Sequence, residues 1–313
     1  MRVCQIGNFG PDNSTENDLR HAFGELKYDV TSIQEDEWIA GREDLPDPDG
    51  HELLLWTRTW KIDDKRAEEQ LSPWVGKIAG YHLDRWWGLN FPEDRFPRGR
   101  QNAVYSDPYF RWLDFWFTAD PQLDRWKAAG VNAVWTPPAV STRWTFDVDP
   151  APAKYPFDVA FVGHVDGYHP EDQARRVMLD VLKQRYGRRF GLLGNTHPRI
   201  VPEELNVVYA SVPVIVGSSV FAGLDSYWSD RIPETLGRGG FLIHPDTDWQ
   251  DTFIPGQHFE TFRPGDWDGL CTLIDQCLED SERRGRVAAQ GAFHVRQEHT
   301  YTARLARLLE IML

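Results

Sequence analysis

Basic residues are scarce in this chain. Its 313 residues include 34 Lys and Arg against 48 Asp and Glu, which gives a formal net charge of −14. A surface of that sign repels polyanions, so a broad footprint for nucleic acid or an anionic membrane is disfavoured. A local basic groove stays open, and the tract Arg95–Arg100 is the candidate for it, although a solvated loop is the favoured interpretation.

Long apolar runs and cysteines are scarce too. No stretch approaches the ~18 apolar residues of a membrane span, and the first residues form a strand pattern, not a basic-then-apolar leader. The three cysteines, Cys4, Cys271 and Cys277, lie in apolar contexts and lack metal-ligand spacing. We therefore expect a cytoplasmic protein with packed thiols and no membrane span.

What is present is an alternation of strand and helix patterns. Hydrophobic residues make up 41% of the chain, which is enough for real cores. Strand patterns in the first half cover 2–7, 29–33, 51–57, 78–84, 115–119 and 131–135. Helical patterns between them include 17–26, which Ser14 or Thr15 can cap. Such alternation predicts a mostly parallel sheet with helices on both faces.

A second series of strands and helices follows a polar, proline-rich stretch, for which we expect a linker at 141–156. Strands are predicted at 157–164, 189–194, 212–217 and 241–243, and helices at 171–186, 203–210 and 267–278. The fold class is therefore α/β, with two Rossmann-like domains at 1–140 and 157–295. The site is expected in the cleft between them, beyond the carboxyl ends of the strands.

The most informative segment runs from Ser229 to Pro245. It reads as a polar loop, a short helix that glycines end, and a buried strand. Arg231 and Glu234 are three positions apart, so both can lie on one helix face. A cation and a carboxylate at a helix start suit a nucleotide, with its anionic group and neighbouring hydroxyls. The alternative is an ordinary surface ion pair.

These residues carry a resemblance to a known family. The segments Arg231–Ile243, Phe259–Phe262 and Glu298–Arg304 resemble the C-terminal domain of GT-B glycosyltransferases, nearest to the CgeB-like (spore-maturation) group of bacteria and phages. The N-terminal motifs Asn8–Gly10 and Ser14–Asn17 are consistent with it. The resemblance implies a GT-B fold in which 1–140 binds the acceptor, 157–295 binds the nucleotide sugar, and a C-terminal helix, 296–313, crosses back to the first domain.

The activity that the resemblance implies is transfer of a sugar from a nucleotide-sugar donor, expected to be a UDP-sugar, to an acceptor hydroxyl. By the same resemblance, Glu234 holds the ribose hydroxyls and Arg231 faces the diphosphate, where a guanidinium fork matches phosphate oxygens. Related families place a second glutamate eight positions before the first, and here that position is Ser226. Gly163 and His164 follow a strand where GT-B folds bring backbone close to the phosphates, with a simple turn as the alternative.

Two further loops belong to the implied donor and acceptor sites. Asn195 closes a strand and is expected to border the base. The loop Gly7-Asn-Phe-Gly-Pro is not a dinucleotide fingerprint. Its Asn8 and Gly10 correspond to the N-domain loop that faces phosphate or acceptor; we place Gly10 with the donor and Asn8 with the acceptor.

Candidate catalytic residues lie at the end of the predicted strand 78–84. His82 and Asp84 are two positions apart, so both can point to one face and either can take a proton from an acceptor hydroxyl. Glu16 is a further candidate at the mouth of the first loop. Trp86 and Trp87 can stack on a sugar or base. The alternatives are a packed histidine, an Asp84–Arg85 ion pair and tryptophans in a core.

Metal binding is the remaining question at the donor site. Asp246 and Asp248 form an Asp-x-Asp pair that resembles the metal motif of GT-A glycosyltransferases, and Asp147 and Asp149 form a second. Such pairs arise by chance in an acidic chain. The two-domain architecture favours transfer with no metal and no cofactor, in which helix termini and basic residues neutralise the diphosphate.

Other classes stay open. One is a nucleotide-sugar epimerase-like enzyme of similar architecture, and another is a non-catalytic nucleotide- or sugar-binding protein. Within the transferase interpretation the acceptor can be a glycan, a protein, a metabolite or a modified base in DNA. A base at Asp84 or His82 would suit inversion of the anomeric centre, and its absence would suit retention.

Overall fold

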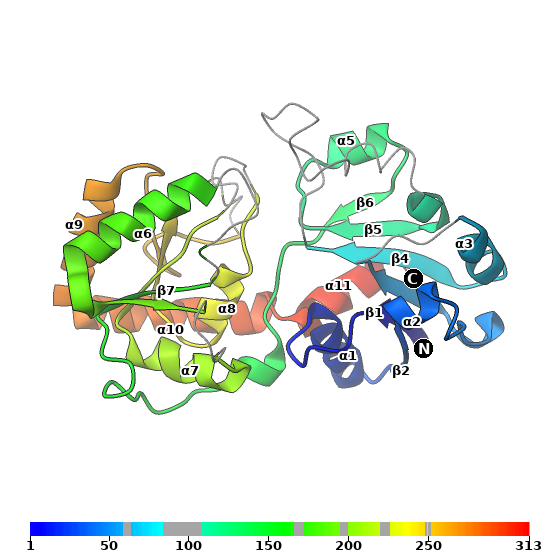
Figure 1. The fold of residues 1–313 in the computed structure, drawn as a ribbon, viewed down its shortest axis with the longest axis horizontal. Helices are drawn as coiled ribbons and strands as arrows, with labels where there is room; N and C mark the ends of the chain where they lie inside the picture. Colours follow the sequence, from blue (N-terminus) through cyan, green and yellow to red (C-terminus); the bar gives the residue numbers. More distant parts are fainter. Residues whose placement is uncertain are drawn as a thin grey trace. The chain divides into compact units, whose positions relative to one another are not determined.

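The computed structural model describes residues 1–58, 64–83, 108–163, 165, 172–194, 200–219, 226–247, 249 and 252–312. The chain divides into two compact units (Figure 1). Unit 1 comprises 1–137 together with 301–313, and unit 2 comprises 138–300. In the described part of the chain, no helix combines the length and the apolar character that a bilayer crossing needs.

Unit 1 is built on a parallel sheet of 6 strands in the order β2-β1-β3-β4-β5-β6. The strands are β1 Arg2–Gly7, β2 Asp29–Gln34, β3 Leu53–Thr57, β4 Lys77–His82, β5 Phe115–Thr118 and β6 Ala133–Trp135. The α-helices that it includes are α1 Thr15–Glu25, α2 Glu35–Ile39, α3 Asp64–Leu71, α5 Leu123–Ala128 and α11 Tyr301–Met312. As predicted, the Ser14 side chain caps α1 by accepting the backbone N–H of Asn17.

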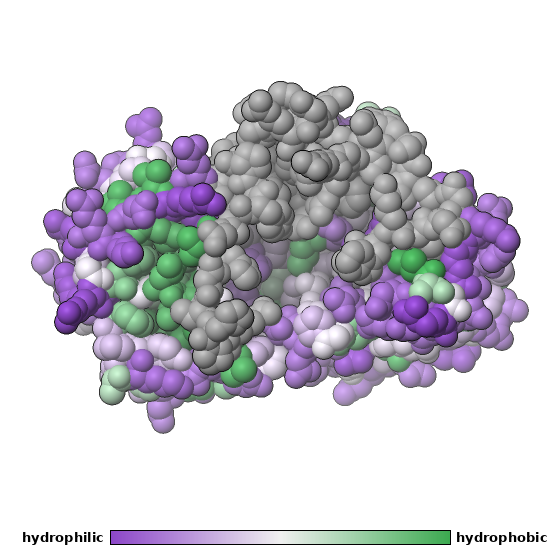
Figure 2. Space-filling model, in the orientation of Figure 1, coloured by the Kyte–Doolittle hydropathy of each residue, from purple (hydrophilic) through white to green (hydrophobic). Residues whose placement is uncertain are grey.

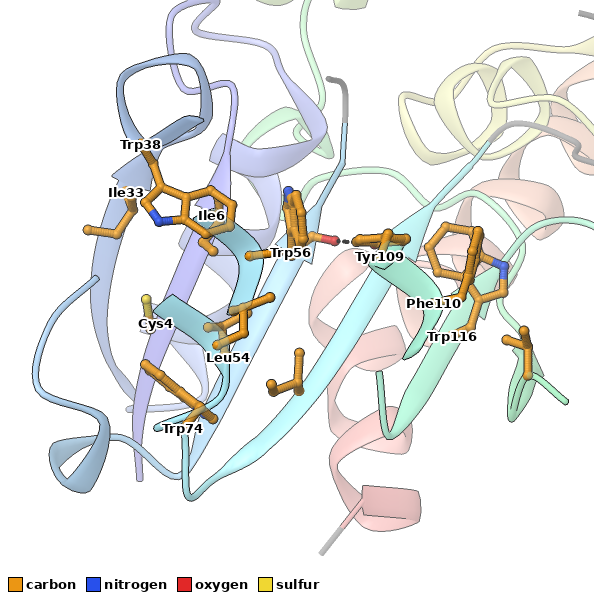
Figure 3. Packing of buried hydrophobic residues seen from close by; sticks show 14 of the residues in the cluster. Cys4, Ile6, Ile33, Trp38, Leu54, Trp56, Trp74, Tyr109, Phe110 and Trp116 are labelled. Carbon is orange, nitrogen blue, oxygen red and sulfur yellow. Dashed lines mark hydrogen bonds between the residues drawn. The ribbon is translucent and has the colours of Figure 1, made fainter. Parts of the chain in front are cut away.

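Aromatic side chains dominate one face of this sheet. Strand β3 is buried along its whole length, and its Trp56 meets Trp38 of α2 at 5.0 Å between ring centroids. Tyr109, in the short 3₁₀ helix η3 Pro108–Trp112, stacks edge-on against Trp56 at 4.5 Å, and its hydroxyl donates to the Trp56 carbonyl at 3.2 Å (Figure 3). These tryptophans are therefore core residues.

Unit 2 is built on a parallel sheet of 5 strands in the order β11-β10-β9-β7-β8. The strands are β7 Val159–Val162, β8 Phe190–Leu193, β9 Val214–Val216, β10 Leu242–Pro245 and β11 Glu260–Phe262. The α-helices that it includes are α6 Asp172–Tyr186, α7 Pro202–Ser211, α8 Arg231–Gly237, α9 Trp267–Glu279 and α10 Ser281–Glu298. Strand β11 was not predicted, because three residues are too few to show a period.

The core of unit 2 lies between the sheet and helices α6 and α9. Phe161, Val216 and Ile243 from three neighbouring strands pack there with apolar residues of both helices. Strand β8 is an edge strand, and the side chain of its Leu192 is 39% exposed. Val177 on α6 is also exposed, at 42%. A hydrophobic area accordingly appears around α6 in the space-filling view (Figure 2).

Residues 141–156, for which we expected a linker, are part of unit 2. The Nδ2 of Asn206 on α7 donates to the carbonyls of Trp144 and Phe146, both at 2.8 Å. The expected C-terminal helix, 296–313, is interrupted. Helix α10 ends at Glu298, and Thr300 pairs with Val140 in unit 2 before α11 starts in unit 1.

Candidate functional site

The guanidinium of Arg231 lies at the carboxyl edge of the unit 2 sheet. Its Nε donates to the Val162 carbonyl at 3.1 Å, and its Nη1 donates to the Ser218 carbonyl at 3.3 Å. Its Cζ lies 5.0 Å from the centre of the Phe161 ring. The arginine therefore connects the carboxyl ends of β7 and β9 by hydrogen bonds to main-chain carbonyls. The alternative was an ion pair of Arg231 with Glu234 or Asp230, and the described residues show neither; Glu234 pairs with Arg238 instead.

Glycine at position 163 makes this placement of Arg231 possible. Gly163 has a φ of 142°, and a Cβ there would lie 2.9 Å from Nε of Arg231 and closer still to Nη2. Gly194, which ends β8 with a φ of 106°, is equally constrained, because its Cβ would lie 2.8 Å from the Gly163 nitrogen. The structure thus brings together Gly163 and Arg231, two residues that the sequence singled out separately.

A second guanidinium belongs to the same edge, and sequence reasoning missed it. Arg175 on α6 is 6% exposed, and its Nε donates to the Ser218 hydroxyl at 2.8 Å. Its Cζ lies 6.0 Å from the Phe161 ring centre. A signal was available: Arg175 shares the spacing of an apolar helix face with three core residues of α6, which are Met178, Leu179 and Leu182. An arginine on such a face needs partners.

Glu234 is held by a different arginine from the one that the sequence suggested. Arg238, one turn further along α8, donates through Nε to Glu234 Oε2 at 2.8 Å. Arg238 is 4% exposed, and its Nη1 donates at 2.6 Å to both the Asn206 side chain and the Pro202 carbonyl. The Glu234 side chain itself is 24% exposed. A buried arginine therefore fixes a carboxylate that reaches the surface of unit 2.

The Asp-x-Asp pair at 246 and 248 is only partly described. Asp246 is exposed and accepts a hydrogen bond from Trp249 Nε1 at 3.1 Å, while Asp248 lies outside the described residues. The other pair includes Asp147, which binds Arg296 at 2.6 Å, and this contact lowers the pKa of Asp147. Within the ranges that the structure describes, no cluster of His, Cys, Asp or Glu could hold a metal ion.

In unit 1, Glu16 lies at the start of α1 beside the end of β1. It is 7% exposed, and burial raises the pKa of its carboxyl group, while hydrogen bonds from the Asn8 backbone and the Ser14 side chain act in the opposite direction. Gly7 leaves room for it, because a Cβ on Gly7 would overlap the Glu16 side chain. A carboxylate with a raised pKa can exchange a proton nearer neutral pH.

The neighbouring loop is organised by Asn8. Its Oδ1 accepts the backbone N–H of Gly10 at 3.2 Å and the Nε2 of Gln34 at 3.4 Å. Gly10 is exposed, so its amide serves the turn of this loop. His82 ends β4, with its ring stacked on Trp116 at 5.9 Å between centroids.

Five of the expected residues lie outside the described part of the chain: Asp84, Trp86, Trp87, His164 and Asn195. Ser226, at the position of the missing glutamate, is described. It is 3% exposed and has a φ of 62°, which is rare for a residue with a side chain. Its hydroxyl has no hydrogen-bond partner in the described ranges.

Comparison with known proteins finds one matching family model and several solved structures of similar fold. Residues 174–310 match the model of a family described as glycosyl transferase-like. No curated protein sequence matches the chain. Among solved structures, sucrose-phosphate synthase from Thermosynechococcus elongatus is similar with a TM-score of 0.66 at 13% identity, covering 99% of this chain and 98% of that one.

Two other solved structures agree. HepE from Anabaena, in complex with UDP and glucose, has a TM-score of 0.64 at 10% identity and covers 99% of both chains. A glycosyltransferase from Rickettsia africae has a TM-score of 0.62 at 9% identity and covers 99% of this chain and 97% of that one. At such identities the likeness shows the fold: two parallel-sheet α/β units, as in GT-B glycosyltransferases. The predicted fold class is confirmed.

Proposed function

We propose that this GT-B chain is a glycosyltransferase that moves a sugar from a nucleotide-sugar donor, a UDP-sugar, to an acceptor hydroxyl. The observation that carries the proposal is the guanidinium of Arg231, which is fixed against Gly163 at the ends of β7 and β9, inside the segment that matches the glycosyl transferase-like model. UDP and UDP-glucose are the ligands of the similar Anabaena protein, which supports a UDP-sugar as donor.

The donor diphosphate would bind Arg231. Nε and Nη1 of this residue are engaged by carbonyls, and Nη2 makes no hydrogen bond with the described residues. Three N–H groups, one on Nη1 and two on Nη2, therefore remain for phosphate oxygens, beside a glycine that lets a ligand approach. His164 would add a second contact. Arg175 positions the Ser218 backbone that holds Arg231, and it adds positive charge nearby.

The nucleoside would bind Glu234 and Asn195. The carboxylate of Glu234, fixed by Arg238, suits the two ribose hydroxyls, because an ionised carboxylate accepts from both. Asn195 would border the base. The positive charge of Arg231 and Arg175 favours transfer without a metal ion, since the leaving diphosphate is neutralised by the protein. The segment Arg231–Ile243 is our basis for a CgeB-like assignment.

The acceptor would bind unit 1. Glu16 is our first candidate for the base that takes the proton of the acceptor hydroxyl, because burial raises the pKa of its carboxyl group. His82 and Asp84 are the alternatives. Asn8, Trp86 and Trp87 would contact the acceptor, and Gly10 would face the donor. The acceptor oxygen attacks the anomeric carbon while the nucleoside diphosphate leaves.

The test measures thermal stabilisation of the purified chain by UDP, GDP, ADP and their glucose derivatives, with EDTA and with Mn²⁺. We expect UDP and UDP-glucose to stabilise in EDTA, by about 2.7 kcal/mol at 100 times the dissociation constant. Stabilisation with Mn²⁺ only would contradict metal independence, and no stabilisation by any nucleotide would refute the proposal. Release of UDP with transfer of glucose separates a transferase from an epimerase or a binding protein.

A further inference from the structure

His244, at the carboxyl end of β10, is a buried group with no role in the proposed function. The side chain is 1% exposed. Its Nδ1 lies 3.0 Å from the Pro245 carbonyl oxygen. Because a carbonyl only accepts hydrogen bonds, we assign the ring proton to Nδ1. The neutral ring then carries a lone pair on Nε2.

That lone pair has no partner among the residues that the structure describes. Nε2 is shielded from solvent and makes no hydrogen bond with the described residues. A buried acceptor of this kind destabilises the fold unless a donor reaches it. Protonation offers no relief, since burial and the charge of Arg231 lower the pKa of His244 to about 4. The ring therefore stays a neutral acceptor at physiological pH.

The position of the ring relates it to the proposed donor site. Ile243 pairs with Val216, and Ile215 pairs with Ala160, so His244 lies level with Gly217 of the next strand end and with Val162 beyond it. A Cβ on Gly217 would lie 2.6 Å from Cδ2 of the imidazole. The Cγ–Cδ2 edge of the ring thus lies over Gly217, the residue before Ser218, whose main-chain carbonyl accepts a hydrogen bond from Arg231.

The chemistry of this position selects its ligand. A lone pair does not bind an anion, and the charge of Arg231 disfavours a cation at Nε2. Within the part of the chain that is described, no cluster of residues could hold a metal ion either. A neutral hydroxyl beside an anionic group remains. We propose that His244 Nε2 accepts a hydrogen bond from a hydroxyl of the bound nucleotide sugar, on the ribose or on the transferred sugar, and so selects a hydroxylated donor. This inference rests on the proposed function.

The test uses His244→Gln and His244→Met, two unbranched side chains of similar size, of which only Gln can place an acceptor near the position of Nε2. Dissociation constants are measured by calorimetry for UDP-glucose, for its 2-, 3-, 4- and 6-deoxyglucose analogues and for its 2′- and 3′-deoxyribose analogues. We expect His244→Met to bind UDP-glucose about tenfold more weakly than wild type, and His244→Gln to stay close to wild type.

The diagnostic result is coupling between one hydroxyl and the histidine. The analogue that lacks the partner hydroxyl should bind wild type about tenfold more weakly, yet bind wild type and His244→Met equally. A coupled ribose analogue would assign the ribose, and a coupled glucose analogue would assign the transferred sugar. If every analogue keeps the same ratio between the two proteins, His244 binds a water or only packs, and the inference is overturned. A wild type that binds no nucleotide sugar overturns the proposed function as well.

Discussion

At the scale of single residues, Arg231 has the sharpest consequence. Its guanidinium bridges two carbonyls and keeps Nη2 unengaged by the described residues, so Arg231→Met should weaken binding of UDP by about 1–3 kcal/mol, the range for a hydrogen bond to a charged group. Calorimetric titration measures it. Arg176→Met, at an exposed position of α6, is the matched control and should leave the affinity unchanged. Equal affinities of both variants would remove Arg231 from the donor site.

Gly163 offers a second residue-scale prediction. Gly163 has a φ of 142°, which an alanine adopts only with strain, and the Cβ of an alanine there would overlap the Arg231 guanidinium. We therefore expect Gly163→Ala to lower the free energy of unfolding by about 1–3 kcal/mol. Urea denaturation provides the measurement. Gly285→Ala is the control within unit 2, because nothing lies within 4 Å of its Cβ and it is inside α10. That variant should gain about 0.5–1 kcal/mol. Similar losses in the two variants would contradict the crowding at Gly163.

At the scale of elements, Arg238 ties α8 to α7. It connects Glu234 with Asn206 and the Pro202 carbonyl, so Arg238→Met removes the hydrogen bonds that Arg238 donates to a carboxylate, an amide oxygen and a main-chain carbonyl. We expect a loss of about 3 kcal/mol in the free energy of unfolding, as for breaking a buried ion pair on one side. Arg188→Met, at an exposed position, should change stability by no more than about 0.5 kcal/mol. A loss of only about 0.5 kcal/mol in Arg238→Met would show that the hydrogen bonds of Arg238 between α8 and α7 do not stabilise the fold.

Most of the helices and strands were predicted from the sequence. The expected strand 2–7 matches β1 at both ends, because hydrophobic periodicity and glycine breaks are local signals. Helix α2 and strand β11 were missed, since five and three residues carry too little pattern. Residues 141–156 have the composition of a linker, yet their carbonyls bind Asn206, a contact that composition does not reveal.

At the scale of the whole molecule, buried histidines make stability depend on pH. Burial, together with the charge of Arg231 for His244 and with the imidazole of His294 for His258, lowers the pKa of each group from 6.5 to about 4. Between these values the unfolded chain binds protons that the folded chain does not, so the free energy of unfolding falls as pH falls from 6.5 to 4. Each histidine contributes up to about 3 kcal/mol to that fall.

Urea denaturation at several pH values across this window measures the effect. His258→Asn keeps an acceptor for the Ile254 backbone N–H, which His258 Nδ1 now accepts at 3.2 Å, but it does not titrate. The variant should therefore lose about half of the dependence that the two histidines create. An unchanged slope in this variant would mean that His258 is already protonated in the folded chain or does not change its pKa on folding.

The sequence by itself determined two parallel α/β series, the capped first helix and the glycine-ended α8, because each follows from patterns within a few residues. It also named Arg231, Glu234, Gly163 and Glu16. Only the tertiary structure decided what these residues do locally: Arg231 binds a carbonyl 69 positions away, and Glu234 pairs with Arg238. Arg175 and the unpartnered Nε2 of His244 emerged only there. Such partners are set by which strand ends meet at one edge of a sheet, and strand order is a property of the folded chain.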